Sequence, residues 1–346
     1  LLRAEARRQG IAVRVEQAGA PLQVHADRVL LEQVVINLGL NALQAMQTHQ
    51  PPPEGHELRL RLAADHGHAL VQVLDRGPGL PPGIAERLFE PFFTTRSGGC
   101  SAAPFDRLNL GDHVGDQVQA VQTNRRALQV LLRSVTPEAR AIFLRQVHGC
   151  EAVHLQPGVP DGTQADACYT STPGSVCTIM VADCLPVLLA HRRVRVVAAA
   201  HAGWRGLAGQ QGGGVLEEVF KGFSALAQVQ KAQAAPENIA KDTLAWLGPC
   251  IGPQAFEVGP EVRAAFCADD AGAQTCFHPG GSGKYFADLP ALARRRLAAL
   301  GITRVYGNDG SPAWCTVAQA SRFFSHRRDA GRLGSTGRMA ACIWLS

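Results

Sequence analysis

All ten cysteines of this 346-residue chain lie at or after Cys100, so residues 1–99 contain none. The formal net charge of +5 is equally uneven, because the first 100 residues carry ten Lys or Arg and ten Asp or Glu. The length is sufficient for two domains or for one large domain. Two stretches that differ so much in composition predict two domains of separate origin that meet near residue 95.

Composition and charge exclude several classes of protein. With 46% hydrophobic residues, the chain has enough apolar side chains for a buried core, which excludes a disordered or low-complexity chain. The longest apolar stretches, near Ile179–Ala190 and Val196–Ala202, are interrupted by Asp183 or His201, so we expect no membrane span. No basic stripe with interleaved aromatic residues is present, so we expect no nucleic-acid partner.

The start of the chain and the cysteines favour the cytoplasm. Leu1–Gly10 is charged and lacks the apolar core of a secretory signal. The cysteines are irregularly spaced and form no C-x-x-C pair, unlike a secreted disulfide framework. We therefore expect reduced, mostly buried thiols in a cytoplasmic protein.

The cysteine-free stretch has the pattern of a helix followed by two strands. Leu30–Met46 has apolar residues at helical spacing, and Asn37 and Asn41, four residues apart, share one face of that helix. Glu57–Leu62 and Leu70–Leu74 are predicted strands that are joined by a His-Gly-His turn. Taken alone, the two asparagines could equally be solvated side chains.

The second of these strands is followed directly by an acid and spaced glycines, Asp75-Arg-Gly-Pro-Gly79. The segment Leu88-Phe-Glu-Pro-Phe-Phe-Thr-Thr95 comes later in the chain. An acid at a strand end can pair with a base while the glycines let the backbone approach closely. This order of motifs, over about residues 1–96, resembles the ATP-binding domain of sensor histidine kinases, in the fold superfamily of DNA gyrase and the Hsp90 chaperones.

That resemblance implies an ATP site, which this chain holds only in part. It implies that Asn41 coordinates Mg²⁺ with Asn37 beside it, that Asp75 reads adenine, and that Gly77 and Gly79 form the first glycine box. The second glycine-rich box, which holds the triphosphate, does not follow the Phe-Phe-Thr-Thr segment. We therefore expect residues 1–95 to be a truncated remnant that does not use Mg-ATP. A working ATP-binding sensor histidine kinase is the alternative.

Beyond Phe105 the sequence has an α/β pattern. Three runs, Val176–Ala182, Pro186–Ala190 and Val194–Ala200, are typical of buried strands, and the polar turn His191-Arg-Arg193 makes the last two a predicted hairpin. Asp288–Leu300 is a predicted helix with an acidic start, Pro in its first turn and Gly just past its end. Met339–Leu345 is a predicted closing strand.

Three residues that can bind a metal occur at predicted strand ends: His148, Cys184 and His201. Their spacings of 36 and 17 residues are too wide for a zinc finger and suit ligands that a sheet brings together. Two imidazoles and one thiolate on Zn²⁺ leave a fourth position open and a site charge of +1, as in catalytic zinc sites. A lone buried Cys or His is more often a packing residue, so the pattern needs further context.

Further motifs provide that context. The order of seven motifs over residues 94–346 resembles the YfiH-like family, once called laccase-domain or polyphenol oxidase proteins and described as purine nucleoside phosphorylases with adenosine deaminase activity. The motifs are F-x-x-L-N-L-G-D-H-V-G-D, N-R, Q-V-H-G, A-D-C-L-P-V-L-L, H-A-G-W-R-G, L-G-P-C-I-G and F-F-S-H-R-R-D. The family's metal ligands correspond to His148, Cys184 and His201, the same three residues that were selected on chemical grounds.

The reactions that the resemblance implies need further side chains, and residues next to the ligands or on nearby loops are candidates. Asp183, next to Cys184, is the candidate for moving protons during deamination at C6 of adenosine, and a loop-capping carboxylate is an equal alternative. Arg205 and Arg96 are candidates for binding phosphate during attack at C1′ of the ribose. Asn109 and His113 are candidates for contacts with the ribose or the base. Each of these last four could equally be a surface or turn residue.

The expected architecture is α/β (α+β): a partial α/β-sandwich ATPase domain over 1–95, followed by a mixed-sheet YfiH-like sandwich over 96–346. The expected cofactor is Zn²⁺, with Cu²⁺ as the alternative, the expected partners are purine nucleosides and phosphate, and a homodimer is left open. The alternatives to a phosphorylase are a peptidoglycan-editing role and a cysteine or metal hydrolase with Cys184 as nucleophile. A multicopper oxidase is disfavoured, because only seven His follow residue 100.

Overall fold

The computed structural model describes residues 2–8, 10–17, 35, 39, 42, 43, 46, 57–65, 68–75, 93–210, 213–230 and 236–345. The chain divides into two compact units, Leu1–Phe89 (unit 1) and Glu90–Ser346 (unit 2). Each is described separately. None of the described helices is both long and apolar enough to cross a membrane.

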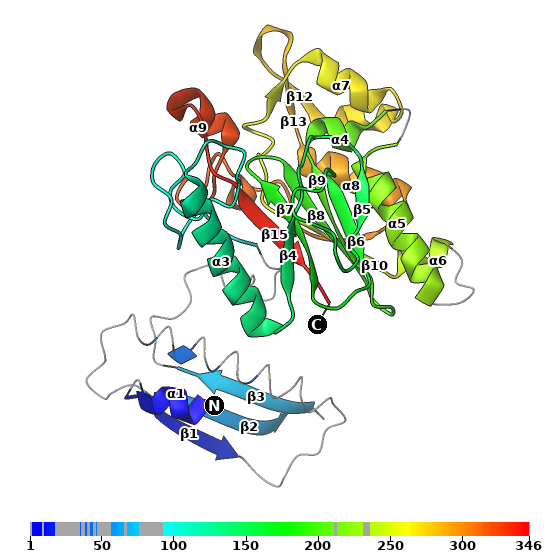
Figure 1. Ribbon diagram of the computed structural model, residues 1–346. Helices are drawn as coiled ribbons and strands as arrows, with labels where there is room; N and C mark the ends of the chain where they lie inside the picture. Colours follow the sequence, from blue (N-terminus) through cyan, green and yellow to red (C-terminus); the bar gives the residue numbers. More distant parts are fainter. Residues whose placement is uncertain are drawn as a thin grey trace. The chain divides into compact units, whose positions relative to one another are not determined.

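Unit 1 contains a three-stranded sheet in the order β1-β2-β3 (Figure 1). Its elements are α1 (Leu2–Arg8), β1 (Ala12–Gln17), β2 (Glu57–Asp65) and β3 (His68–Leu74). The strands β2 and β3 are antiparallel, which confirms the predicted strand pair, and β1 runs parallel to β2. Helical residues Leu43 and Met46 are buried in the same cluster as Leu58 of β2, so the predicted helix is confirmed where it is described.

Unit 2 has two stacked sheets with helices on both outer sides (Figure 1). The larger sheet has the order β14-β10-β8-β9-β6-β5 and the smaller one the order β15-β7-β4. The strands are β4 (Arg140–Phe143), β5 (Ala152–His154), β6 (Ala167–Thr170), β7 (Ser175–Val181), β8 (Leu185–His191), β9 (Val197–Ala202), β10 (Thr243–Leu247), β14 (Arg304–Gly307) and β15 (Met339–Ile343). A further small sheet pairs β11 (Glu257–Val258), β13 (Tyr285–Ala287) and β12 (Phe277–Pro279).

The two main sheets share one apolar core, which includes Ile179 and Val181 of β7 and Leu188 and Ala199 of the larger sheet. Strands in this position are buried on both faces, because helices cover their other side. That arrangement explains why the apolar runs predicted as strands are continuous rather than alternating. The predicted mixed α/β sandwich is therefore confirmed.

Helices complete both outer layers. The longest is α3 (Val118–Val135), which packs on the smaller sheet, while α5 (Val215–Gln230) packs on the larger one (Figure 1). The other helices are α4 (Trp204–Ala208), α6 (Pro236–Lys241), α7 (Pro260–Cys267), α8 (Leu289–Ala299) and α9 (His326–Leu333), with short 3₁₀ turns at Ala271–Cys276, Gly281–Gly283 and Pro312–Trp314. The predicted helix after Asp288 is confirmed, because the Asp288 carboxylate accepts a hydrogen bond from the Ala291 N–H at 2.9 Å and caps α8.

The predicted hairpin of β8 and β9 is also confirmed, but β9 begins three residues later than expected. The reason is the imidazole of His191, whose Nδ1 accepts the backbone N–H groups of Arg193 and Val194 at 3.1 Å each. These bonds hold a turn through Val194, so pairing starts only at Val197.

The segment at the junction of the two predicted domains belongs to unit 2. Phe93 forms a β-bridge with Ala341, and the N–H of Thr94 donates to the Ala340 carbonyl at 2.9 Å. The Ala340 N–H in turn donates to Thr94 Oγ1 at 2.9 Å. Residues that resemble the end of a kinase motif therefore close the edge of the smaller sheet beside β15.

Candidate metal centre and active-site pocket

The structure brings His148, Cys184 and His201 together. His148 lies in the turn between β4 and β5, Cys184 lies between β7 and β8, and His201 is in β9. The pairing of Leu185 with Ala202 places Cys184 beside the end of the strand that carries His201. One potential ligand atom from each residue lies within 4.8 Å of the other two, as a shared metal ion requires.

The backbone around this cluster is shaped to fit it. A Cβ on Gly203 would lie 3.0 Å from His148 Cδ2 and 3.1 Å from Cys184 Sγ, so a side chain there would press on both ligands. His148 and Asp183 have positive φ angles of 62° and 97°, which residues with a side chain rarely adopt. Strain of this kind persists at functional sites when the surrounding contacts hold it in place.

Asp166 holds two of the three ligand segments. Its side chain is fully buried and accepts the backbone N–H groups of Val147 at 3.1 Å, His148 at 2.9 Å and Gly149 at 2.7 Å. It also lies 2.8 Å from Nδ1 of His201. A carboxylate on Nδ1 leaves Nε2 of His201 as the ligand atom and orients the ring, as in many metal sites.

The charges of the cluster favour metal binding. Burial raises the pKa of the Cys184 thiol, but the neighbouring His201 and His148 outweigh it and lower that pKa to about 6. Burial lowers the pKa of His201, but the Cys184 thiolate and Asp166 outweigh it and raise that pKa to about 9. Cys184 is thus a thiolate near neutral pH, which is the form that binds a metal or attacks as a nucleophile.

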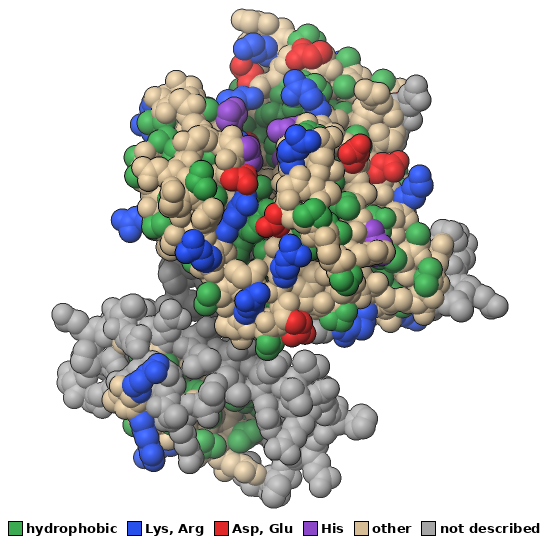
Figure 2. All heavy atoms as spheres, in the orientation of Figure 1, with side chains coloured by type: hydrophobic (Ala, Val, Ile, Leu, Met, Phe, Trp, Pro, Cys, Tyr) green, Lys and Arg blue, Asp and Glu red, His purple; other side chains and the backbone are tan. Residues whose placement is uncertain are grey.

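The cluster lies in a pocket of about 340 Å³, a size that suits a small molecule. Figure 2 shows histidine side chains gathered around a hollow on the visible face of unit 2. The aromatic rings of Trp204 and Phe256 and the side chains of Arg327 and Arg338 also line the pocket. It therefore combines metal ligands, flat apolar surfaces and positive charge.

The other residues expected at the site divide into two groups. Asp183 and His113 line the pocket. Asp183 accepts hydrogen bonds at 2.6 Å from Thr316 Oγ1 and from the Arg327 N–H, so it also caps the start of α9. Arg205 is exposed, lies 4.5 Å over the Trp204 ring and lines an adjoining pocket that shares Trp204 and His148 with the first.

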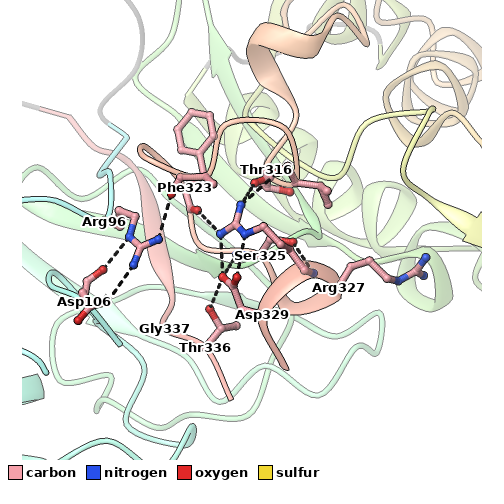
Figure 3. Close-up of polar contacts among 12 residues, drawn as sticks. Arg96, Asp106, Thr316, Phe323, Ser325, Arg327, Asp329, Thr336 and Gly337 are labelled. Carbon is pink, nitrogen blue, oxygen red and sulfur yellow. Dashed lines mark hydrogen bonds and ion pairs between the residues drawn. The ribbon is translucent and has the colours of Figure 1, made fainter. Parts of the chain in front are cut away.

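Arg96 and Asn109 are not among the described residues that line the pocket, and both bind protein groups. The guanidinium of Arg96 donates to the carbonyl and carboxylate of Asp106 at 2.8 and 3.2 Å, and to the Ala320 carbonyl at 3.0 Å (Figure 3). Asn109 is fully buried and accepts the N–H groups of Gly111 and Arg338 at 2.9 Å each. Their roles in substrate binding stay predictions.

Sequence reasoning missed Asp166 and Arg338. The only local signal for Asp166 is an acid between Ala165 and Ala167 at the start of a buried strand. Arg338 stands at the end of a glycine-rich segment directly before β15, and nothing near it in sequence indicates a pocket. Both act through contacts with residues more than ten positions away, which spacing alone does not reveal.

The remnant ATP site is only partly described. Asn37, Asn41, Gly77 and Gly79 lie outside the described residues. Asp75 directly follows β3 and is exposed, at the strand end where the sequence predicts it.

Comparisons with known proteins match this division of the chain. Residues 90–346 match the family model described as multi-copper polyphenol oxidoreductase laccase. Residues 26–104 match the model described as histidine kinase-, DNA gyrase B- and HSP90-like ATPase. The two matches overlap over residues 90–104, which include the segment around Thr94 and Arg96.

Relatives and solved structures agree with the first of these matches. The chain is 45% identical over 266 residues to purine nucleoside phosphorylase YfiH of Shigella flexneri, which covers 77% of this chain and 96% of that protein. It is 46% identical to purine nucleoside phosphorylase PA4543 of Pseudomonas aeruginosa, over 73% of this chain and 91% of that one. The crystal structure of Neisseria meningitidis protein NMB0706 superimposes with a TM-score of 0.63 at 41% identity, covering 73% of this chain and 93% of that one. The chain therefore belongs to the YfiH-like family of laccase-domain proteins, with a histidine-kinase-type ATPase segment before that domain.

Proposed function

We propose that residues 96–346 form a metal-dependent purine nucleoside phosphorylase that acts on adenosine, inosine and S-methyl-5′-thioadenosine and also deaminates adenosine. The segment expected over residues 1–95, of which Leu1–Phe89 form the separate unit 1, is a truncated histidine-kinase-type ATP-binding domain without kinase activity. The observation that carries this proposal is the pocket that places His148, Cys184 and His201 beside aromatic rings and arginines. The names of the relatives support the same activity.

Phosphorolysis requires a charged nucleophile and a held nucleoside. A phosphate oxygen forms a bond to C1′, the bond from C1′ to the purine N9 breaks, and N9 takes the electron pair and then a proton. In our proposal the Trp204 and Phe256 rings hold the flat purine, and the positive groups of the pocket hold the phosphate. Holding both reactants in one geometry removes much of the entropic barrier.

Deamination needs a proton acceptor near C6 of adenosine, where water adds and ammonia leaves. Asp183 is our candidate for moving that proton, because it lines the pocket next to Cys184. Its two oxygens already accept hydrogen bonds from Thr316 and Arg327, and each retains a further lone pair.

The donor set suits Zn²⁺, with Cu²⁺ as the alternative. The thiolate of Cys184, the orientation of His201 by Asp166 and the open backbone at Gly203 support this proposal. When bound, such a metal supplies Lewis acidity and activates water. Among the described residues, His148, Cys184 and His201 form the one group of side chains that could hold a metal ion. Three ligands are too few for the several coppers of a multicopper centre.

A specific contact favours a second candidate, a cysteine hydrolase. The hydrogen-bonded chain from Asp166 through His201 to Cys184 has the arrangement of a nucleophile, a base and an orienting acid. Metal analysis with a chelator separates the two candidates. Stoichiometric metal and loss of turnover on chelation support the metalloenzyme, whereas metal-free turnover that iodoacetamide abolishes supports the hydrolase.

The main experiment incubates the metal-loaded chain with adenosine, inosine and methylthioadenosine, with and without phosphate. We expect free base only when phosphate is present, and inosine from adenosine in either condition. Cys184→Ala should abolish both products. Absence of adenine, hypoxanthine and inosine in every reaction would refute the proposal.

A further inference from the structure

Arg338 is the group from which we draw a further inference. It directly precedes β15, lines the pocket with Cys184 and Asp183, and is partly buried. Burial lowers the pKa of this guanidinium, and the negative charges of Cys184 and Asp183 act in the opposite direction but are outweighed.

Among the described residues, the guanidinium of Arg338 forms no ion pair, although the charges of Asp183 and Cys184 act on it from a greater distance. Its Nη1 donates to the carbonyls of Thr336 at 3.0 Å and Gly337 at 3.2 Å. Within the described part of the chain no carboxylate oxygen lies within 4.0 Å of its nitrogens, and its Nε and Nη2 have no hydrogen-bond partner. By contrast, Arg125 and Arg328 form ion pairs with Asp112 and Asp329.

A cation that is partly withdrawn from water and has no ion-pair partner is stabilised when an anion binds beside it. The free Nε and Nη2 lie on one edge of the planar guanidinium, where their parallel N–H groups match two oxygens of a tetrahedral oxyanion. The unpaired fork therefore indicates a binding function rather than a role in stabilising the fold.

The position of Arg338 is held from several sides. The side-chain oxygen of Asn109 accepts its backbone N–H at 2.9 Å. A Cβ on Gly111 would lie 2.7 Å from Arg338 Cγ, so this glycine leaves room for the arginine stem. Thr336 donates to Asp329 at 3.3 Å and fixes the preceding turn, as Figure 3 shows. Such support is typical of a preorganised binding group.

We propose that Arg338 binds inorganic phosphate through Nε and Nη2 in the pocket beside the His148–Cys184–His201 cluster. The choice of phosphate rests on the proposed phosphorylase function, whereas the oxyanion site itself rests on the unpaired guanidinium. The 5′-phosphate of a nucleotide has the same chemistry, so the experiment includes both. Asn109 is then a positioning residue for Arg338 rather than a substrate contact.

The test compares the metal-loaded wild-type chain, Arg338→Gln, Arg338→Lys and the control Arg126→Gln, whose arginine is exposed on α3. Calorimetry at constant ionic strength, with inorganic phosphate and separately with inosine 5′-monophosphate, measures Kd for each anion. Inosine turnover measures KM for each substrate. For Arg338→Gln we expect Kd and KM for phosphate to rise about 10- to 100-fold, since charge-assisted bonds are lost. The KM for inosine should stay nearly constant, Arg338→Lys should recover part of the affinity, and Arg126→Gln should match wild type.

A second measurement does not depend on a folded variant. Phenylglyoxal modifies arginines that it can reach, at the surface or in an open pocket, and peptide mapping of the wild-type chain measures the rate at each one. Phosphate should slow modification of Arg338 about tenfold or more and leave Arg126 unaffected. Equal rates at Arg338 with and without phosphate, or an unchanged phosphate Kd in Arg338→Gln, would overturn the inference.

The outcomes separate this inference from the proposed function. Arg338-dependent phosphate binding without nucleoside cleavage refutes the phosphorylase and supports the oxyanion site. Phosphate-dependent cleavage that Arg338→Gln leaves unchanged supports the phosphorylase and overturns the assignment of the phosphate site to Arg338. Arg338-dependent binding of inosine 5′-monophosphate without any binding of free phosphate overturns the choice of inorganic phosphate.

Discussion

Replacing the buried acid Asp166 with asparagine tests whether it organises the metal centre. Its Oδ2 accepts the N–H groups of Val147 and Gly149, and its Oδ1 accepts those of His148 and His201 Nδ1. In Asp166→Asn one carboxylate oxygen becomes an NH₂ group. The two N–H donors that this oxygen accepted then face another donor, and their hydrogen bonds are lost. Each lost hydrogen bond to a charged group costs about 1.5–3 kcal/mol, so the expected loss of unfolding free energy is about 3–6 kcal/mol.

For a domain of this size, 1 kcal/mol corresponds to about 2–4 °C in Tm, so Asp166→Asn should lower the Tm by at least about 6 °C. Disruption of this support should also weaken metal binding about 10- to 100-fold. Calorimetric unfolding and metal titration measure the two effects.

The matched control is Asp161→Asn, because the exposed Asp161 carboxylate accepts one backbone N–H, that of Phe143, at 3.0 Å. It should change the Tm less and leave metal affinity unchanged. A Tm within about 2 °C of wild type for Asp166→Asn, together with unchanged metal affinity, would refute this reasoning.

Three further predictions concern other parts of the chain. Arg96→Gln should lower the Tm by a few degrees, because its bonds to Asp106 are lost, and leave the KM for phosphate unchanged; a rise of about tenfold would instead support the phosphate-binding role predicted from sequence. In the metal-free protein, absorbance at 240 nm should rise with a midpoint near pH 6 as Cys184 loses its proton, and Cys184→Ser should lack this step. A midpoint near the ordinary thiol pKa of about 8.5 would contradict the charge arrangement with His201. A chain without residues 1–89 should keep its nucleoside activity, whereas removal of residues 1–96 should destabilise it, as the Tm of both proteins will show.

Much of the fold could be predicted because it depends on local pattern. The apolar runs of β7 and β8 and the capped helix after Asp288 are visible in short windows of sequence. The start of β9 could not be predicted, because the side chain of His191 decides where the turn ends.

The candidate site was predictable only where chemistry is specific to a residue type. His148, Cys184 and His201 stand out because imidazole and thiolate bind metals and lie at strand ends. Asp166 and Arg338 do not stand out, since acids and arginines are common and their role arises from contacts across the fold.

The domain boundary also depends on contacts between residues that are far apart in the sequence. The resemblance to the kinase family extends to about residue 96 and that to the YfiH-like family begins at residue 94, so sequence alone does not decide which domain Thr94 and Arg96 serve. Their hydrogen bonds with Ala340 and with the Asp106 and Ala320 groups place them in unit 2.

The most direct test of the central claim is ³¹P NMR of the metal-loaded chain with inosine and phosphate. We predict that a ribose 1-phosphate resonance appears as hypoxanthine is released, mole for mole, and that Cys184→Ala produces neither. Release of hypoxanthine with free ribose and an unchanged phosphate signal, or no release at all, would contradict the claim that this pocket catalyses phosphorolysis.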